Sequence, residues 1–335
     1  MSSFDGRDPC ARVRATCAKV TRNARHVNVD ADAVSRFVDA LGDDDVSRLK
    51  RGCGGFDDGA HHGDVHGDEE AMAMFTLCVD AINFCFWPDH DDEVETGEGL
   101  EYEHLTRGWR EAHAKDRKVL TCDRLRKMTG EELRAILNWP RPLPDEETRA
   151  RLIREVGDGL AKSFNSSCAE FVRAANGSAV RLVALVIQHF PGFRDEARDV
   201  NGDEVFFYKR AQIFVGDLWG SFCGRGLGCF NDIESLTMFA DYRVPVTLRE
   251  HSILQYDDAL LTKIVNKQEV PANSAEEIEI RACTVMAVEA IRERFSQKHD
   301  DHISSIVIDW LLWEKGEAKR ETSVEPHHRT RTTFY

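Results

Sequence analysis

One carboxylate interrupts an apolar and aromatic run between residues 235 and 246, SLTMFADYRVPV. Asp241 follows three apolar residues, and Pro245 is expected to end any helix that reaches it. An unpaired carboxylate in apolar surroundings is costly, so such a group is either paired with a cation or kept for a chemical purpose. The apolar neighbours would exclude water and strengthen the field of the carboxylate, and the proline would fix the turn that presents it.

Three other segments combine aromatic rings with charged groups. They contribute Phe84, Phe86 and Trp87; Tyr208, Lys209 and Arg210; and Asp309, Trp310 and Trp313. Aromatic faces can hold a flat heterocycle, a lysine or arginine can hold a phosphate, and an aspartate can face positive charge on a sugar. Hydrolysis of a glycosidic bond passes through an oxocarbenium-like state, which an ionised carboxylate stabilises while it orients or deprotonates water. These residues therefore suit the hydrolysis of a glycosidic bond.

A structural interpretation of the same residues stays open at this point. Aromatic side chains are large hydrophobic groups and usually pack in the core. The charged groups among them would then form scaffold ion pairs, either Lys209 with Asp241 or Arg243 with Asp309. Only the catalytic interpretation needs the carboxylate of Asp241 to face a cavity.

Two other motifs are weaker candidates for a functional site. The segment 51–70 is rich in Gly, Asp and His, and its candidate metal ligands are His61, His62, Asp64, His66 and Asp68. The glycines among them allow no rigid helix, so a flexible surface insert is predicted instead of a metal site. The glycine motif GRGLGCF at 224–230 follows a predicted helix and not a strand, so a loop is expected there, with phosphate contact as an alternative.

Composition and charge narrow the class of protein. The chain has 335 residues, 42% of them hydrophobic, which suffices for one large domain or two fused ones. The net charge of −15 disfavours duplex nucleic acid as the main partner and favours a small molecule. No apolar run reaches the ~20 residues of a membrane span, and the N-terminal sequence is unlike a signal peptide. The scattered cysteines, with Cys17, Cys168 and Cys283 expected to be buried, fit reduced thiols in the cytoplasm.

The elements that must position these residues are mainly helices. Apolar residues recur at helical spacing in segments 30–41, 144–164, 178–193 and 274–295. Asp145 and Ser274 are the expected N-caps of the second and last of these helices. The best candidates for strands are 82–87 and 204–209. The acidic stretch 89–98 is predicted to be a solvated loop.

At these residues the chain resembles the queuosine salvage proteins, a family of queuosine 5′-phosphate N-glycosylase/hydrolases. The resemblance covers nearly the whole chain and is carried by FYKRAQIFVGDLW (207–219), GLGCFNDIESLTMFADYRVP (226–245), EEIEIRACTVMAVEAIR (276–292), ISSIVIDWLLW (303–313) and HHRTRTTFY (327–335). CAKVTRNARHVNVDADAV (17–34) and AINFCFWPD (81–89) are also similar. The segment 99–109 matches loosely, and the insert has no counterpart.

The resemblance implies a mainly α fold, a single helical domain over residues 1–335 with a few short strands, similar in outline to helical DNA glycosylases. It implies cleavage of queuosine 5′-phosphate to queuine and ribose 5-phosphate, with Asp241 as the catalytic carboxylate and Lys209 as its cationic partner. The substrate-binding residues that it implies are Phe84, Trp87, Tyr242, Arg243, Asp309, Trp310, Trp313, His328 and Arg329. It implies no metal and no cofactor, and we expect a cytoplasmic monomer that binds a small molecule and contacts neither nucleic acid nor membrane.

Two alternatives stay open from the sequence. A non-catalytic carrier of queuine or a related base would use the same aromatic cluster, but it would not need a carboxylate near the anomeric carbon. A glycosylase that acts on intact nucleic acid would need a basic, aromatic-interleaved surface, which the acidic composition disfavours.

Overall fold

Helices carry most of the chain, which confirms the predicted fold class. The computed structural model describes residues 8–56, 68–87, 99–319 and 325–335. The helices before residue 200 are α1 (Pro9–Asn23), α2 (Ala31–Asp39), α3 (Asp43–Lys50), α5 (Glu69–Ala81), α7 (Tyr102–Lys115), α8 (Cys122–Leu125), α9 (Gly130–Ile136), α10 (Glu146–Ser163), α11 (Cys168–Arg173) and α12 (Ala179–His189). They are followed by α13 (Lys209–Ser221), α14 (Val244–Glu250), α15 (Asp258–Val265), α16 (Ala275–His299) and α17 (Ser305–Ala318).

In the part of the chain that the structure describes, four short strands form two separate antiparallel pairs. Strand β1 (Val27–Val29) pairs with β4 (Leu254–Tyr256), and β2 (Glu196–Arg198) pairs with β3 (Glu204–Phe206). Five short 3₁₀ turns join other elements, namely η1 (Gly52–Gly55), η2 (Arg117–Leu120), η3 (Pro191–Phe193), η4 (Gly226–Gly228) and η5 (Ile233–Ser235). The strands are therefore local connectors, and the helices build the core.

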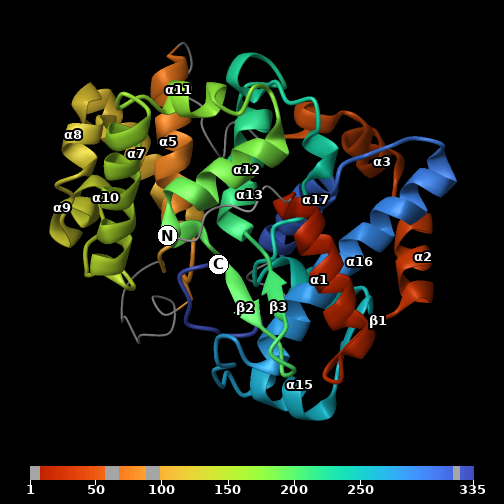
Figure 1. Cartoon of the computed structure of the whole chain (residues 1–335). Helices are drawn as coiled ribbons and strands as arrows, with labels where there is room; N and C mark the ends of the chain where they lie inside the picture. Colours follow the sequence, from red (N-terminus) through yellow and green to blue (C-terminus); the bar gives the residue numbers. More distant parts are fainter. Residues whose placement is uncertain (1–7, 57–67, 88–98, 320–324) are drawn as a thin grey trace.

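The helices gather in two groups with α13 between them (Figure 1). On one side lie α5 and α7 to α10, and on the other side lie α1, α2 and α16. Helix α13 packs against α5 and α12, whereas α16 packs against α1, α2 and α17. Helix α13 thus packs on the first group through α5, whereas α12 contacts α1 of the second group. The first residue of α13 is Lys209.

The four helices predicted from apolar spacing are all present. In α16, the predicted apolar positions Ile280, Cys283, Ala287, Ile291 and Phe295 are buried, and the hydroxyl of Ser274 accepts the N–H of Glu277. Helix α10 begins as predicted, but its N-cap, Asp145, has φ +50° and makes no capping hydrogen bond through its side chain. Helix α12 ends at His189, before Pro191, as a proline requires.

The strand predicted at 82–87 is wrong, because this segment follows α5 as buried irregular chain. Its backbone groups are satisfied by groups other than a neighbouring strand. The guanidinium of Arg149 donates to the carbonyls of Ile82, Phe84 and Cys85, and the N–H of Cys85 donates to the carbonyl of Tyr335 at 2.9 Å. The apolar sequence correctly indicates that the segment is buried. Its carbonyls, however, are bound by a buried arginine and not by the backbone of a neighbouring strand.

The strand predicted at 204–209 is shorter than expected and ends at Phe206. Tyr208 turns the chain with φ +51°, a conformation that side chains rarely adopt, and α13 begins at the next residue. At its other end α13 stops at Ser221, and Gly224 and Gly226 adopt φ +69° and +51°. The expected loop after a helix is therefore confirmed.

Much of the predicted insert 51–70 lies outside the described residues, including His61, His62, Asp64 and His66. The described part is built into the fold, because Phe56 packs against Trp310 at 4.9 Å and Asp68 caps α5 by accepting the N–H of Ala71. Within residues 8–56, 68–87, 99–319 and 325–335, no group of three or more His, Cys, Asp or Glu side chains is placed to hold a metal ion. The predicted loop 89–98 also lies outside the description.

All ten cysteines lie in the described ranges and are free thiols. Cys17, Cys168 and Cys283 are buried, as predicted. None of the described helices combines the length and the apolar content that crossing a membrane requires.

Candidate active site

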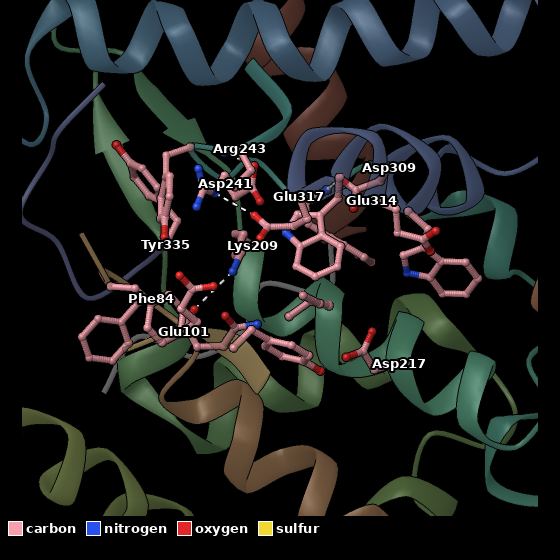
Figure 2. Close-up of a pocket in the computed structure, with 18 of the residues that line it drawn as sticks. Phe84, Glu101, Lys209, Asp217, Asp241, Arg243, Asp309, Glu314, Glu317 and Tyr335 are labelled. Atoms are coloured by element: carbon pink, nitrogen blue, oxygen red, sulfur yellow. Dashed lines mark hydrogen bonds and ion pairs between the residues drawn. The ribbon is translucent and has the colours of Figure 1, made fainter. Parts of the chain in front are cut away.

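A pocket that encloses about 870 Å³, part of it open to solvent, lies beside α13. Its walls come from Phe56, the 82–87 segment, the start of α7, the first three turns of α13, residues 239–243, α17 and Tyr335. Figure 2 shows Lys209, Asp241, Asp309 and Glu317 pointing into this common space. Of the predicted site residues, Phe84, Lys209, Asp241, Tyr242, Arg243, Asp309, Trp310 and Trp313 line the pocket.

Asp241 stands at the N-terminus of α14, which fixes the direction of its carboxylate. Its Oδ1 accepts the backbone N–H groups of Arg243 and Val244, each at 3.0 Å. Pro245 occupies the first turn of α14, where its missing N–H costs nothing, so the proline begins a helix instead of ending one. The expectation that it would end a helix is corrected.

Burial raises the pKa of Asp241 above its ordinary value, while Lys209 and the N–H groups of Val244 and Arg243 lower it. The carboxylate is thus poised between desolvation, which favours the neutral acid, and three groups that favour the anion. A charge held in this way exerts a strong field on anything bound beside it.

Lys209 supplies the opposite charge from the first turn of α13. It is 4% exposed, and its Nζ donates to the carbonyl oxygen of Asn83 at 3.2 Å. Burial lowers the pKa of Lys209, whereas Asp241, Asp80 and Asp309 raise it. Among the described residues no ion pair within 4 Å joins Lys209 to Asp241, so the scaffold ion pair considered for these two residues is not formed. Both residues line the pocket.

Three buried aspartates, Asp80, Asp217 and Asp309, and the partly buried Asp241 interact electrostatically with this one lysine. Burial raises the pKa of Asp80 to about 7 and also raises the pKa of Asp217 and Asp309. Asp309 is further fixed by the N–H of Phe239, which donates to its Oδ1 at 3.0 Å. Carboxylates that share a dry site cannot all be ionised, so part of this cluster is protonated near neutral pH.

Aromatic rings form the walls on either side of these charges. Trp310 stacks on Trp219 with 5.6 Å between centroids and also contacts Phe56. Tyr102 and Trp313 meet edge to face at 6.1 Å. Flat rings held by one another in this way form a rigid slot that suits a planar heterocycle.

Arg243 pairs with a different partner from the predicted one. Its Nε lies 2.8 Å from Oε1 of Glu317, whereas the suggested pair with Asp309 is not formed. Glu317 follows Trp313 by one turn of α17, so both face the same side. The ion pair therefore sits in the pocket wall, beside the tryptophans.

Three of the predicted site residues lie outside the pocket lining. Trp87 donates from Nε1 to the carbonyl of Thr330 at 3.4 Å, and the guanidinium of Arg329 lies over its ring. His328 is 2% exposed, its Nε2 is 3.2 Å from the hydroxyl of Tyr335, and burial lowers its pKa to about 3. In this structure these residues contact the C-terminal segment, and their roles as substrate contacts stay predictions.

Sequence reasoning missed an acidic mouth, which we define as Glu101, Glu103, Glu314 and Glu317. Glu314 and Glu317 follow Trp310 at helical spacing, and this spacing was available in the sequence. Glu101 and Glu103 flank Tyr102 at the start of α7, in the segment whose resemblance to the family is loose. Asp217, two turns after Lys209 on α13, was also missed.

Comparisons with known proteins agree on one family. The queuosine salvage protein family matches residues 63–335. A queuosine 5′-phosphate N-glycosylase/hydrolase from Dictyostelium discoideum is 42% identical, with 98% of this chain and 100% of that protein covered. Proteins with the same name from Sphaerobacter thermophilus and Mus musculus are 36% and 33% identical, with 96% of this chain covered in each case and 97% and 98% of their own lengths.

Proposed function

The chain belongs to the queuosine salvage protein family, and on this basis we propose that it hydrolyses the N-glycosidic bond of queuosine 5′-phosphate. The products are the base queuine, which becomes available for reinsertion into transfer RNA, and ribose 5-phosphate. The observation that carries the proposal is the partly buried carboxylate of Asp241, which lines a pocket with aromatic walls and is held by two N–H groups.

The proposed reaction uses the charges of the pocket directly. As the bond between ribose C1′ and the base nitrogen breaks, its electron pair leaves with the base and positive charge develops on the sugar. Asp241 stabilises that charge, the oxygen of water bonds to C1′, and the proton that the water loses ends on the base nitrogen that held the ribose. Lys209 keeps the carboxylate ionised at that moment, and the aromatic slot holds the base.

The excess of acid in the pocket suits the amine of queuine. Among the described lining residues, seven side chains are acidic and two, Lys209 and Arg243, are basic. An anionic pocket of this kind repels a phosphate but attracts a cation. Glu314 and Glu317 are already paired with Arg48 and Arg243, so we assign Glu101 and Glu103 of the acidic mouth to the ammonium group of the base, and the side of Arg243 to the phosphate.

This assignment predicts that removing one mouth carboxylate affects only substrates that carry the amine. Glu103 is exposed at the start of α7, and we expect Glu103→Gln to raise KM for queuosine 5′-phosphate by about threefold to tenfold, because a partly solvated charge pair is lost. KM for 7-deazaguanosine 5′-phosphate, which lacks the amine, should stay the same. Steady-state kinetics on both substrates test this, with Glu111→Gln on the same helix as the matched control. Equal changes on the two substrates would contradict the assignment.

The proposed function itself is tested by incubating the pure protein with queuosine 5′-phosphate and measuring released queuine by chromatography. We expect release of base and ribose 5-phosphate in equal amounts. Tight binding without release would identify a carrier instead. Binding to oligonucleotides that weakens steeply with salt would indicate a glycosylase acting on nucleic acid.

We further propose that residues 1–335 act as one catalytic unit, as a monomer in the cytoplasm. Residues from Phe56 to Tyr335 line the same pocket, so segments far apart in the chain are needed together. The free thiols support a reducing compartment.

A further inference from the structure

A buried ion pair between Asp195 and Arg281 lies behind the pocket. Both side chains are 3% exposed, and the contact is bidentate, with Nη1 2.8 Å from Oδ1 and Nη2 2.6 Å from Oδ2. Two parallel hydrogen bonds fix the plane of the guanidinium as well as its position. Neither residue belongs to the pocket lining.

The remaining hydrogen bonds of this pair reach the backbone beside both charged groups of the site. Oδ2 of Asp195 accepts the N–H of Lys209 at 3.1 Å. Nε of Arg281 donates to the carbonyl oxygen of Ala240 at 3.2 Å, and Ala240 immediately precedes Asp241. One ion pair is therefore hydrogen-bonded to the chain at Lys209 and next to Asp241.

The backbone on both sides needs such support. The segment 236–241 has no regular secondary structure, and the residue before Lys209 has φ +51°. The carbonyl of Asp195 accepts the N–H groups of Phe207 and Tyr208 at 3.0 and 3.3 Å, so the same residue also holds the strained turn. These bonds therefore hold the irregular chain immediately before the start of α13 and immediately before Asp241.

The ion pair is itself held firmly. The guanidinium of Arg281 lies between two rings, 4.0 Å from the centroid of Phe207 and 4.3 Å from that of Tyr335. Glu277, one turn earlier on α16, approaches Nη1 at 3.6 Å. Because α16 is a long buried helix, the position of Arg281 is set by the core.

From this geometry we propose that Asp195 and Arg281 are positioning residues, which set the separation and direction of Lys209 and Asp241 for the reaction. The proposal rests on the proposed function. It assigns no contact with the substrate to either residue, so they act on turnover and leave binding of the base intact.

The test is Arg281→Lys, which keeps the charge opposite Asp195 but loses the planar fork and the bond to Ala240. We expect kcat for queuosine 5′-phosphate to fall by about 10²-fold, the scale of a misplacement near 1 Å, while KM and the dissociation constant of queuine change less than about threefold. Asp195→Asn, which keeps one acceptor oxygen, should lose about tenfold. The matched control is Arg294→Lys, which makes the same exchange in another ion pair of α16, with Asp39, and neither residue belongs to the pocket lining. It should leave kcat within about threefold of the wild type.

The outcomes distinguish a failure of the proposed function from a failure of the positioning role. A wild-type protein that releases no queuine contradicts the proposed function. The positioning role is overturned if the wild type is active and the folded Arg281→Lys protein has an unchanged kcat or a loss in KM alone. A loss of kcat equal to that of Arg294→Lys overturns it as well. If circular dichroism shows that Arg281→Lys does not fold, Asp195→Asn is judged by the same criteria.

Discussion

Asp241→Asn is expected to lower kcat for queuosine 5′-phosphate by about 10²–10⁴-fold while the fold is kept. The amide oxygen of asparagine can still accept the N–H groups of Arg243 and Val244, so α14 keeps its N-terminal cap. What is lost is the negative charge that faces the sugar. Affinity for queuine should stay within about threefold, because the base lies in the aromatic slot.

Single-turnover release of queuine and the melting temperature are the measurements for this variant. The matched control is Asp30→Asn, which changes the residue that caps α2 through the N–H of Ala33. It alters the same kind of bond outside the pocket lining. If Asp241→Asn turns over at a near-normal rate, Asp241 does not take part in the mechanism.

Lys209→Met is expected to lower kcat at pH 7 by about 10²-fold and to move the acid side of the pH–rate profile to higher pH. Lys209 lowers the pKa of Asp241, so removing the ammonium group raises that pKa further above its ordinary value. At a given pH a smaller fraction of Asp241 is then ionised, and the rate recovers only as the pH rises. Asp80 and Asp309, which face the same lysine, lose their counter-charge as well.

The measurement is kcat between pH 5 and 9 for the wild type, Lys209→Met and the control Lys263→Met, which breaks an ion pair with Glu276 remote from the pocket. Assays on the nucleotide and on the free nucleoside add a second distinction. Equal losses on both place Lys209 at the glycosidic bond, whereas a larger loss on the nucleotide makes it a phosphate ligand. An acid limb that does not move contradicts control of Asp241 by Lys209.

The parts of the fold that depend on local spacing could be predicted. Apolar periodicity located α2, α10, α12 and α16, because a helix that packs on a core must carry one apolar face. The unusual setting of Asp241 was equally visible, since a carboxylate among aromatic residues is conspicuous without any structure. The prediction that Lys209 is the cationic partner of Asp241 came from the resemblance to the family.

Features that depend on partners distant in the chain could not be predicted. The apolar residues of the 82–87 segment indicated a buried strand. Arg149, which donates to its carbonyls instead, lies far along the chain, and no local pattern connects it with this segment. Arg243 has several acidic residues within reach in three dimensions, and sequence spacing does not choose Glu317 over Asp309. The Asp195–Arg281 pair joins residues 86 positions apart in the same way.

The irregular 82–87 segment affects how reproducibly the chain folds into the same pocket. A strand can pair two residues out of alignment and still satisfy its ladder, and an exposed strand edge can recruit another chain. Arg149 instead donates to particular carbonyls, so a shifted alignment leaves its guanidinium unsatisfied. The position of Phe84 in the pocket wall is therefore fixed. The segment has no strand register that could shift and no exposed strand edge that could pair with another chain.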